Sequence, residues 1–354
     1  MSEVEDYATG YKQFLSKAKT ERLSVDEFLK TAKENGYKSL EEVLSCGKIN
    51  PGDKIYAVNR DKTIVLFVIG ENEIEKGMRI VGGHIDSPRL DLKQNPLYEE
   101  GDLCFLKTHY YGGIKKYQWP TIPLAIYGVV YLDNGEKVNI AIGDDEEDPV
   151  FCITDILPHL ASTQYTKKIS EAIPAESLNI LIGSIPLDGE EKEAVKANIS
   201  KFIKEKYNII EEDFQTAEIE IVPAGKARDL GLDRSMILSY GHDDRVCSYG
   251  AVKAIFDLKE IPKYTAVALC VDKEEVGSQG NTGMCSRYFE NIVAELVSLQ
   301  GEYSDLKIRR AISNTKVLSA DVSAGYDPNF ADAYEKNNSS ILGNGLTINK
   351  YTGS

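Results

Sequence analysis

Three short apolar segments in this chain each end at a loop that carries acidic or histidine side chains. The first ends at His84, the second is followed by Glu274 and Glu275, and the third ends at Asp321. Segments of this length are typical of buried strands, and a helical pattern over 284–299 lies between the second and the third. The alternation predicts an α/β fold with a mostly parallel sheet flanked by helices. Since ligands bind beyond the carboxyl ends of such strands, we expect these loops to share one crevice.

Glu274 and Glu275 form an adjacent carboxylate pair at the mouth of the second predicted strand. Neighbouring side chains on an extended segment diverge, so one carboxylate can bind a metal ion while the other takes a proton from the water on that ion. Standing alone, such a pair would be typical of a solvated surface turn. Other residue types that bind metals occur at the remaining strand ends, and together with this pair they favour metal-assisted hydrolysis.

A His-x-Asp sequence closes the first predicted strand. His84 can offer a neutral imidazole to a divalent ion, and Asp86 can accept the other ring N–H and hold the ring in place. For His84 considered alone, the alternative is a histidine satisfied by backbone groups in a turn. The third predicted strand adds Asp321, another acid at a strand end.

The sequence Gly241-His242-Asp243-Asp244 precedes a segment whose small and apolar residues recur at helical spacing. A carboxylate with one oxygen for each of two ions is the simplest way to hold a metal pair, and Asp243 is the candidate for this bridge. Asp243 or Asp244 could instead cap the helix, a common use of aspartate. Together, these acids and one imidazole predict two divalent ions, and such ligands suit zinc, cobalt and manganese alike.

The length of 354 residues exceeds the usual limit of about 250–300 for a single core and favours two domains. Residues 1–94 are predicted to hold an N-terminal helical stretch, with Ser24 as a helix N-cap, and the first part of a catalytic domain. Residues 95–235 are predicted to form an inserted β-rich domain, with an Asn-Gly hairpin signal at 134–135. Residues 236–354 would form the second part of the catalytic domain.

A formal net charge of −15 argues against nucleic acid or an anionic membrane as a partner. No stretch approaches the roughly 20 apolar residues of a membrane span, and the acidic N-terminus lacks a signal-peptide core, so we expect a cytoplasmic protein. The six cysteines are scattered without a Cys-x-x-Cys pair, which favours reduced, buried thiols.

Several segments that carry these residues form a specific set. They are His84-Ile85-Asp86-Ser87-Pro88, Tyr111-Gly112-Gly113, Pro158-His159-Leu160, Asp243-Asp244, Asp272-Lys273-Glu274-Glu275-Val276-Gly277-Ser278 and Ser319-Ala320-Asp321. On these segments the chain resembles, from its first residue to its last, the aspartyl aminopeptidase family of metallo-aminopeptidases. The resemblance implies a di-zinc exopeptidase-like fold. The metal ligands that it implies are His84, Asp243, Glu275 and Asp321, with Asp243 bridging.

The resemblance also implies a reaction and partners. Glu274 would be the general base that activates a water bridging the two ions. Apart from the resemblance, we expect Asp86 and Asp244 to support the ligands. The substrates would be peptides with a free N-terminus, from which the first residue is removed. The inserted domain would mediate dimer contacts and close the site, in a homo-oligomer built from dimers. His159 matches a family histidine that reaches into a neighbouring subunit's active site, which would make it a second catalytic residue.

One departure from the family pattern concerns the C-terminal end. Family members supply a second histidine ligand from a Met-His segment, and this segment has no counterpart before Ser354. The chain contains four histidines, and His109, His159 and His242 are not obvious substitutes. We therefore expect a C-terminally incomplete chain. The alternative function is that of a catalytically impaired family member that acts as a fold remnant or assembly component.

Overall fold

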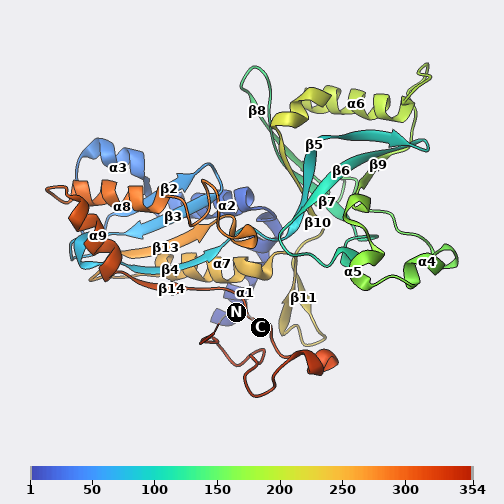
Figure 1. The fold of residues 1–354 in the computed structure, drawn as a ribbon. Helices are drawn as coiled ribbons and strands as arrows, with labels where there is room; N and C mark the ends of the chain where they lie inside the picture. The colour runs from blue at the N-terminus through green and yellow to red at the C-terminus, as the bar shows by residue number, and fades with distance from the viewer. Residues whose placement is uncertain (1, 352–354) are drawn as a thin grey trace.

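The computed structural model describes residues 2–351 and contains two separate six-stranded sheets (Figure 1). The first sheet, with helices on both faces, lies on the left of the view, and the second lies on the upper right with α6 above it. The chain crosses from the first sheet to the second after β4 and returns before α7. In residues 2–351 no helix is both long enough and apolar enough to cross a membrane.

The first sheet has the strand order β1-β2-β3-β13-β4-β14. β13 and β14 both pair parallel to β4, whereas β3 runs antiparallel to β2 and to β13. The strands are β1 (Lys38–Ser39), β2 (Lys54–Asn59), β3 (Thr63–Val68), β4 (Arg79–His84), β13 (Ala266–Val271) and β14 (Lys316–Ser319). The three parallel strands therefore bring their carboxyl ends to one edge of the sheet.

Side-chain alternation gives the first sheet two apolar faces. On β3, Val65 and Phe67 join one core and Ile64 and Leu66 join the other, as the strand period of two requires. Helices α3, α8 and α9 cover the first face, and α1, α2 and α7 cover the second. Their bounds are α1 (Glu3–Lys17), α2 (Glu21–Glu34), α3 (Leu40–Cys46), α7 (His242–Phe256), α8 (Tyr288–Leu299) and α9 (Asp305–Asn314). The structure thus confirms a sheet flanked by helices.

The second sheet is antiparallel throughout, in the order β8-β7-β10-β5-β6-β9. Its strands are β5 (Arg89–Glu100), β6 (Leu103–Tyr111), β7 (Leu124–Tyr131), β8 (Lys137–Ile142), β9 (Ile180–Gly183) and β10 (Glu218–Pro223), and α6 (Ala194–Tyr207) packs on it. It has its own core, in which Leu90, Leu124 and Ile221 are fully buried. The two sheets therefore belong to separately packed parts of the chain.

The remaining elements are short. A small antiparallel pair, β11 (Arg228–Leu230) and β12 (Met236–Leu238), precedes α7. The short helices are α4 (Ser162–Tyr165) and α5 (Ile169–Ala172), and the 3₁₀ turns are η1 (Ile74–Lys76), η2 (Lys116–Gln118), η3 (Pro158–Leu160), η4 (Ala175–Ser177), η5 (Glu211–Thr216), η6 (Glu274–Val276) and η7 (Pro328–Ala333). The predicted insert boundary at residue 95 falls within β5, because β5 pairs in the second sheet from its first residue, Arg89.

The predicted N-cap at Ser24 is wrong. Helix α2 begins at Glu21, and Thr20 is its N-cap, with Oγ1 accepting the N–H of Leu23 at 3.3 Å. Ser24 lies one turn inside the helix, fully buried, where its hydroxyl donates to the carbonyl oxygen of Thr20 at 2.8 Å. Both residues are good capping types, so the sequence alone did not separate them.

Candidate metal centre

His84 is the last residue of β4 and is 3% exposed. Its ring nitrogen Nδ1 lies 2.9 Å from the backbone carbonyl oxygen of Asp86, which can accept the ring N–H, and 3.3 Å from Asp86 Oδ1. The backbone N–H of His84 donates to Asp244 Oδ2 at 3.2 Å. Asp86 therefore orients the ring mainly through its main chain, and Nε2 is left for other partners.

Three carboxylates from distant parts of the chain surround Nε2 of His84. It lies 3.1 Å from Asp243 Oδ1, 3.7 Å from Glu274 Oε2 and 3.9 Å from Asp321 Oδ1. Asp243 lies at the start of α7, Glu274 in η6 after β13, and Asp321 just beyond β14. The shared edge of β4, β13 and β14 is the reason that these residues meet.

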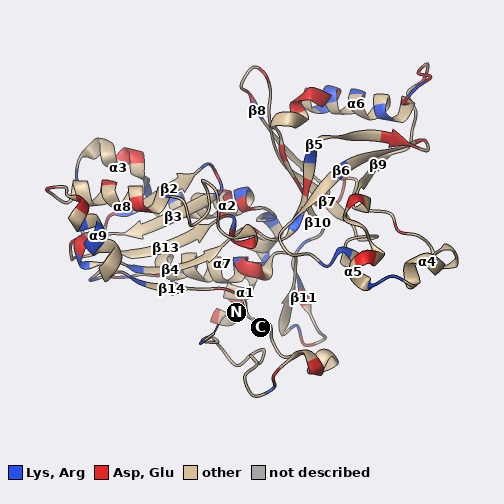
Figure 2. Ribbon diagram, in the orientation of Figure 1, with Lys and Arg blue, Asp and Glu red and all other residues tan. Residues whose placement is uncertain are grey.

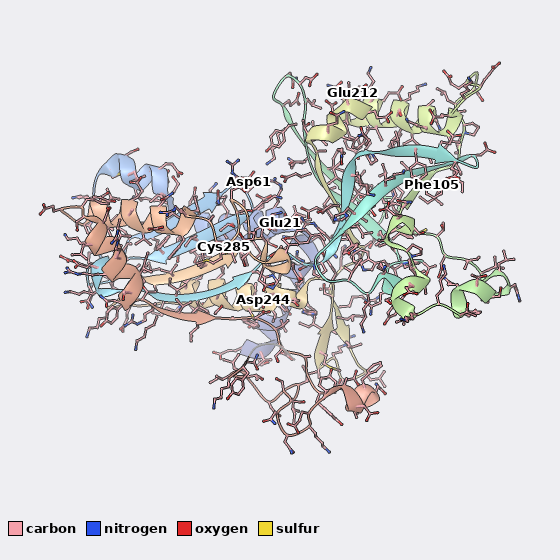
Figure 3. The ribbon with its side chains drawn as sticks, in the orientation of Figure 1. Glu21, Asp61, Phe105, Glu212, Asp244 and Cys285 are labelled. Atoms are coloured by element: carbon pink, nitrogen blue, oxygen red, sulfur yellow. The ribbon has the colours of Figure 1, made fainter. Side chains whose placement is uncertain are left out.

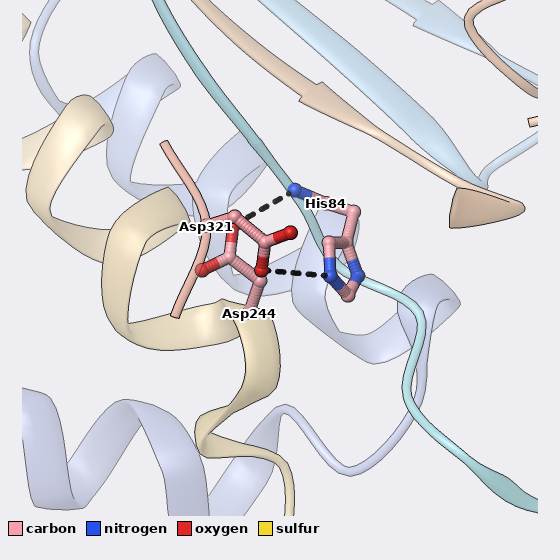
Figure 4. A group of neighbouring side chains, drawn as sticks. All are labelled: His84, Asp244 and Asp321. Atoms are coloured by element: carbon pink, nitrogen blue, oxygen red, sulfur yellow. Dashed lines mark hydrogen bonds and ion pairs between the residues drawn. The ribbon is translucent and has the colours of Figure 1, made fainter. Parts of the chain in front are cut away.

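Two groups of side chains have ligand atoms within 4.8 Å of one another: His84 with Asp243 and Glu275, and His84 with Asp244 and Asp321. Asp244 comes from the start of α7, where Figure 2 shows an acidic segment, and Figure 3 labels it near the middle of the molecule. Figure 4 shows Asp244 and Asp321 side by side facing His84. We call these five residues together with Glu274 the acidic cluster.

Asp244 does not cap α7 with its side chain. The start of this helix has no side-chain capping bond at Gly241, and Asp244 Oδ2 instead accepts the N–H of His84. Its other oxygen, Oδ1, is buried without a hydrogen-bond partner among the described residues. A buried carboxylate oxygen without a donor is costly, and a cation at this position would satisfy it.

The acidic cluster holds more acid than its one imidazole can neutralise. Burial raises the pKa of Glu275 to about 7, and the nearby charge of Asp243 adds to the rise. Burial also raises the pKa of Asp244 to about 7 and raises the pKa of Glu274. Burial alone would lower the pKa of His84, but hydrogen bonds to neighbouring carboxylates raise it to about 11. Added positive charge would therefore stabilise this site.

Asp86 is fully buried and ties several parts of the site together. Its Oδ1 accepts the backbone N–H of Glu274 and its Oδ2 the backbone N–H of Glu275, each at 3.2 Å. Its Oδ2 also accepts the hydroxyl of Tyr111 at 2.6 Å. Burial opposes ionisation, but the hydrogen bonds from His84 and Tyr111 lower the pKa of Asp86, so the carboxylate stays charged.

Four residues at the site were not predicted from the sequence. The hydroxyl of Ser87 donates to the carbonyl oxygen of Asp243 at 2.6 Å, and that of Ser248 donates to the carbonyl oxygen of His84 at 2.7 Å. A Cβ on Gly83 would lie 2.4 Å from Asp244 Oδ2, so any larger residue there would displace this carboxylate. Tyr111 is the fourth. The motifs His84-Ile85-Asp86-Ser87 and Tyr111-Gly112-Gly113 already drew attention to Ser87 and Tyr111. They did not indicate which residues these two would contact.

The other predicted catalytic residue, His159, lies outside the acidic cluster. It is exposed in η3, just before α4, and Figure 1 places α4 at the far right of the second sheet, away from α7. His242 is next to Asp243 but turns away: its Nδ1 lies 2.9 Å from the Tyr11 hydroxyl and its Nε2 lies 3.1 Å from the carbonyl oxygen of Ile237. Among the described residues, His84 alone supplies an imidazole to either group.

The donor set fits a hard or borderline divalent ion. Carboxylate oxygens suit such ions and an imidazole nitrogen suits zinc, cobalt or manganese in particular. The groups have different exposure, since the side chains of Asp243, Glu274 and Asp321 are 50%, 47% and 58% exposed whereas that of His84 is 3% exposed. An ion held here would therefore be anchored on a buried imidazole and open to solvent on its carboxylate side.

Comparison with known proteins identifies the family. The family model described as aminopeptidase I zinc metalloprotease (M18) matches residues 14–354. A probable M18 family aminopeptidase 1 from Clostridium acetobutylicum is 56% identical over 356 residues, which cover 100% of this chain and 76% of that protein. Its counterpart in Borrelia garinii is 49% identical and is matched over 77% of its length by 99% of this chain.

Solved structures agree with this result. The crystal structure of an M18 family aminopeptidase from Thermotoga maritima superposes with a TM-score of 0.91 at 44% identity, over 96% of this chain and 74% of that one. The Clostridium acetobutylicum aminopeptidase I structure gives a TM-score of 0.88 at 50% identity, over 97% and 75%. The S. cerevisiae mApe1 dodecamer, at 21% identity and a TM-score of 0.76 over 96% and 76%, shares the fold. The chain belongs to the M18 family of zinc metallo-aminopeptidases.

Proposed function

We propose that this chain removes the N-terminal residue from peptides by metal-assisted hydrolysis at the acidic cluster. The observation that carries the proposal is the convergence of Asp243, Glu274 and Asp321 on Nε2 of His84, at 3.1–3.9 Å, in a member of a zinc metallo-aminopeptidase family. No basic side chain other than His84 lies within ion-pair distance of these three carboxylates among the described residues. The cluster therefore needs charge from outside the chain.

The proposed ligands are His84, Asp243, Glu275 and Asp321. Asp243 is proposed as the bridge between two ions because it is the carboxylate nearest to His84 and also lies within ligand range of Glu275. Asp244 is proposed to support the site, since its Oδ2 accepts the His84 N–H. Zinc is the proposed metal, with cobalt and manganese as chemically acceptable substitutes.

Glu274 is the proposed general base. Bound ions would polarise the first peptide carbonyl and lower the pKa of the attacking water toward neutrality. Glu274 would accept the proton from that water and deliver it to the leaving amine, and its raised pKa suits a group that must do both. Its backbone N–H bond to Asp86 fixes the start of its side chain relative to His84. A free α-amino group anchored at the same cluster would present only the first peptide bond.

The second sheet is proposed to carry the dimer contact of a homo-oligomer, with His159 reaching the site of a partner copy. Apolar side chains around His159 are largely exposed: Leu157 by 51%, Leu160 by 64%, Tyr165 by 70% and Ile169 by 65%. A cluster of this kind is typical of an interaction surface. The related S. cerevisiae protein is described as a dodecamer, which fits an assembly built from dimers.

A second candidate function is that of a non-catalytic member that keeps the fold and serves in assembly. One observation favours it: among the described residues a single imidazole serves both ligand groups. Metal titration decides between the two. We expect about two zinc ions per chain together with release of the N-terminal residue from short peptides. One ion or none, without peptide hydrolysis under zinc saturation, would select the non-catalytic candidate.

A further inference from the structure

We propose that Tyr111, a residue of the second sheet, positions the Glu274–Glu275 turn through its hydrogen bond to Asp86. Tyr111 contacts no proposed ligand atom, so its role is positioning and not catalytic. The proposal rests on the proposed function, because it concerns where the base and one ligand are held. It gives the second sheet a part in the site that is independent of any dimer contact.

The bond pattern around Asp86 leads to this inference. Tyr111 ends β6, is 7% exposed, and donates its hydroxyl to Asp86 Oδ2 at 2.6 Å. The same oxygen accepts the backbone N–H of Glu275 at 3.2 Å, and Oδ1 accepts that of Glu274. One carboxylate therefore joins the end of a strand in the second sheet to the turn that carries both glutamates.

The turn closes on itself through the N–H groups of residues 276–278, but those of Glu274 and Glu275 have no backbone acceptor among the described residues. η6 has no side-chain capping bond at its start, and it lies between Lys273 and Gly277, both in the left-handed region at φ 72° and φ 87°. Glycine adopts this region freely, but Lys273 is strained there and keeps the conformation only because surrounding contacts hold it. The two N–H bonds to Asp86 are contacts of this kind.

A second contact comes from the residue after Tyr111. Gly112 has φ +72°, and a Cβ built on it would lie 3.2 Å from both Cβ and Oε2 of Glu275. The backbone of the second sheet thus passes close to the Glu275 side chain with no room to spare. Segment 111–112 is therefore linked to the Glu275 main chain through Asp86, and at Gly112 it leaves no space for a side chain beside Glu275.

The ring of Tyr111 is itself fixed by cations. The Arg89 guanidinium lies 4.0 Å from the ring centroid and the Lys273 ammonium lies 5.3 Å from it. Arg89 is held in turn by Glu21 at 3.2 Å and by Asp91 at 2.7 Å. The hydroxyl is therefore presented to Asp86 by a ring whose orientation is fixed, which is what positioning requires.

The test is Tyr111→Phe, which removes the hydroxyl and keeps the ring. Tyr110→Phe is the matched control, since Tyr110 is the preceding residue of β6, is 40% exposed and has no hydroxyl hydrogen bond among the described contacts. Zinc affinity is measured by competition with a chelator, and kcat and KM are measured on a short peptide. The absorption spectrum of the cobalt-loaded protein reports the ligand geometry.

We expect Tyr111→Phe to lower zinc affinity about 10- to 100-fold, as loss of a group that supports a ligand does, and to lower kcat by a similar factor with little change in KM. The cobalt spectrum should change as well, whereas Tyr110→Phe should match the unaltered protein in all three. A purely structural role would lower the melting temperature and leave metal affinity and the cobalt spectrum unchanged.

The proposal is overturned if the two variants have the same zinc affinity and cobalt spectrum. Failure of the proposed function would be visible in the unaltered protein, as absent peptide hydrolysis, before any variant is compared. In a protein that binds zinc without hydrolysing peptides, the zinc affinity and the cobalt spectrum still decide for or against Tyr111.

Discussion

The molecule gathers carboxylates in two places and offsets their charge in two different ways. Where the two sheets meet, Glu21, Lys62, Arg89 and Glu220 form what we call the junction cluster, and Figure 3 labels Glu21 in this central region. Glu21 is fully buried and lies 3.1 Å from Lys62 and 3.2 Å from Arg89. In the acidic cluster, by contrast, one imidazole faces all of the carboxylates.

The contrast shows what a buried acid needs. Removing a carboxylate from water is expensive, and the cost is offset by hydrogen bonds or a nearby positive charge, or is avoided by protonation. In the junction cluster Glu220 keeps a proton and the charge of Glu21 is offset by two cations, Lys62 and Arg89, so the cluster can be complete without a ligand. The acidic cluster lacks such cations, so protons or metal ions must take that place. The first arrangement is typical of structure and the second of a binding site.

The largest expected effect concerns Glu274. Changing Glu274 to Gln should lower kcat by about 10²- to 10⁴-fold, because an amide cannot accept the proton of the attacking water, while bound zinc is retained. Peptide hydrolysis and elemental analysis of the same sample check the two parts. Turnover equal to that of the unaltered protein would remove Glu274 from the reaction.

The next effect tests whether the junction cluster is self-sufficient. Arg89→Met should lower the free energy of unfolding by about 3–5 kcal/mol, since it leaves buried Glu21 and Glu220 short of a cation. Arg79→Met is the control, because Arg79 also lies over a ring, 3.8 Å from the centroid of Tyr264, but pairs with no carboxylate among the described residues.

Arg79→Met should cost less than about 1 kcal/mol, the usual size of an exposed cation–π contact. Both variants are compared by denaturant unfolding at neutral pH. Similar losses in the two would mean that stacking, and not charge, is what Arg89 contributes.

A smaller effect is expected for the ligand next to the base. Glu275→Ala removes a proposed ligand, so its effect should reach at least the upper end of what loss of a supporting group produces. We therefore expect zinc binding to weaken by at least about 100-fold. Competition with a chelator measures the change. Because Glu274 is adjacent on the same turn, Glu274→Gln serves as the matched control that should keep its metal. Full zinc occupancy in Glu275→Ala at limiting metal would contradict the ligand assignment.

The smallest effect is a pH dependence in the junction cluster. Burial and the adjacent charge of Glu21 raise the pKa of Glu220 well above the ordinary glutamate value of 4.5, although Arg89 partly opposes the rise. The folded protein therefore keeps a proton that the unfolded chain loses. Its contribution to stability is complete below pH 4.5 and declines as pH rises toward the folded pKa, by at most about 1.4 kcal/mol per pH unit.

Glu220→Gln should abolish this decline, so the variant should gain stability relative to the unaltered protein as pH rises from 4.5. Melting temperatures measured across that range provide the check. Curves that run parallel would show that Glu220 ionises normally in the folded protein.

Much of the fold could be predicted because it depends on local pattern. Apolar segments that end at His84, Asp321 and the glutamate pair are strands whose carboxyl ends meet, and this needs no knowledge of tertiary contacts. The antiparallel pairing of β3 with β13 was not predicted, because a fully buried strand has the same pattern in either direction.

The supporting contacts of the site were harder to predict for a physical reason. Asp86 was predicted to orient His84, but its bonds to the glutamate turn and to Tyr111 join residues that are far apart in sequence. Gly83 and Gly112 are needed because another segment approaches them closely, and a sequence does not state which segment that is. Such contacts follow from the arrangement of the two sheets and not from any local period.

The protonation of the acidic cluster has a consequence for how the protein would take up metal. Despite burial, its carboxylate partners raise the pKa of His84 to about 11, and burial raises the pKa of Glu275 and of Asp244 to about 7, so without metal His84 is protonated and the two acids are partly protonated at neutral pH. Each arriving ion must expel some of these protons. Loading would acidify its surroundings, and calorimetric heats of zinc uptake would vary with the ionisation enthalpy of the buffer chosen.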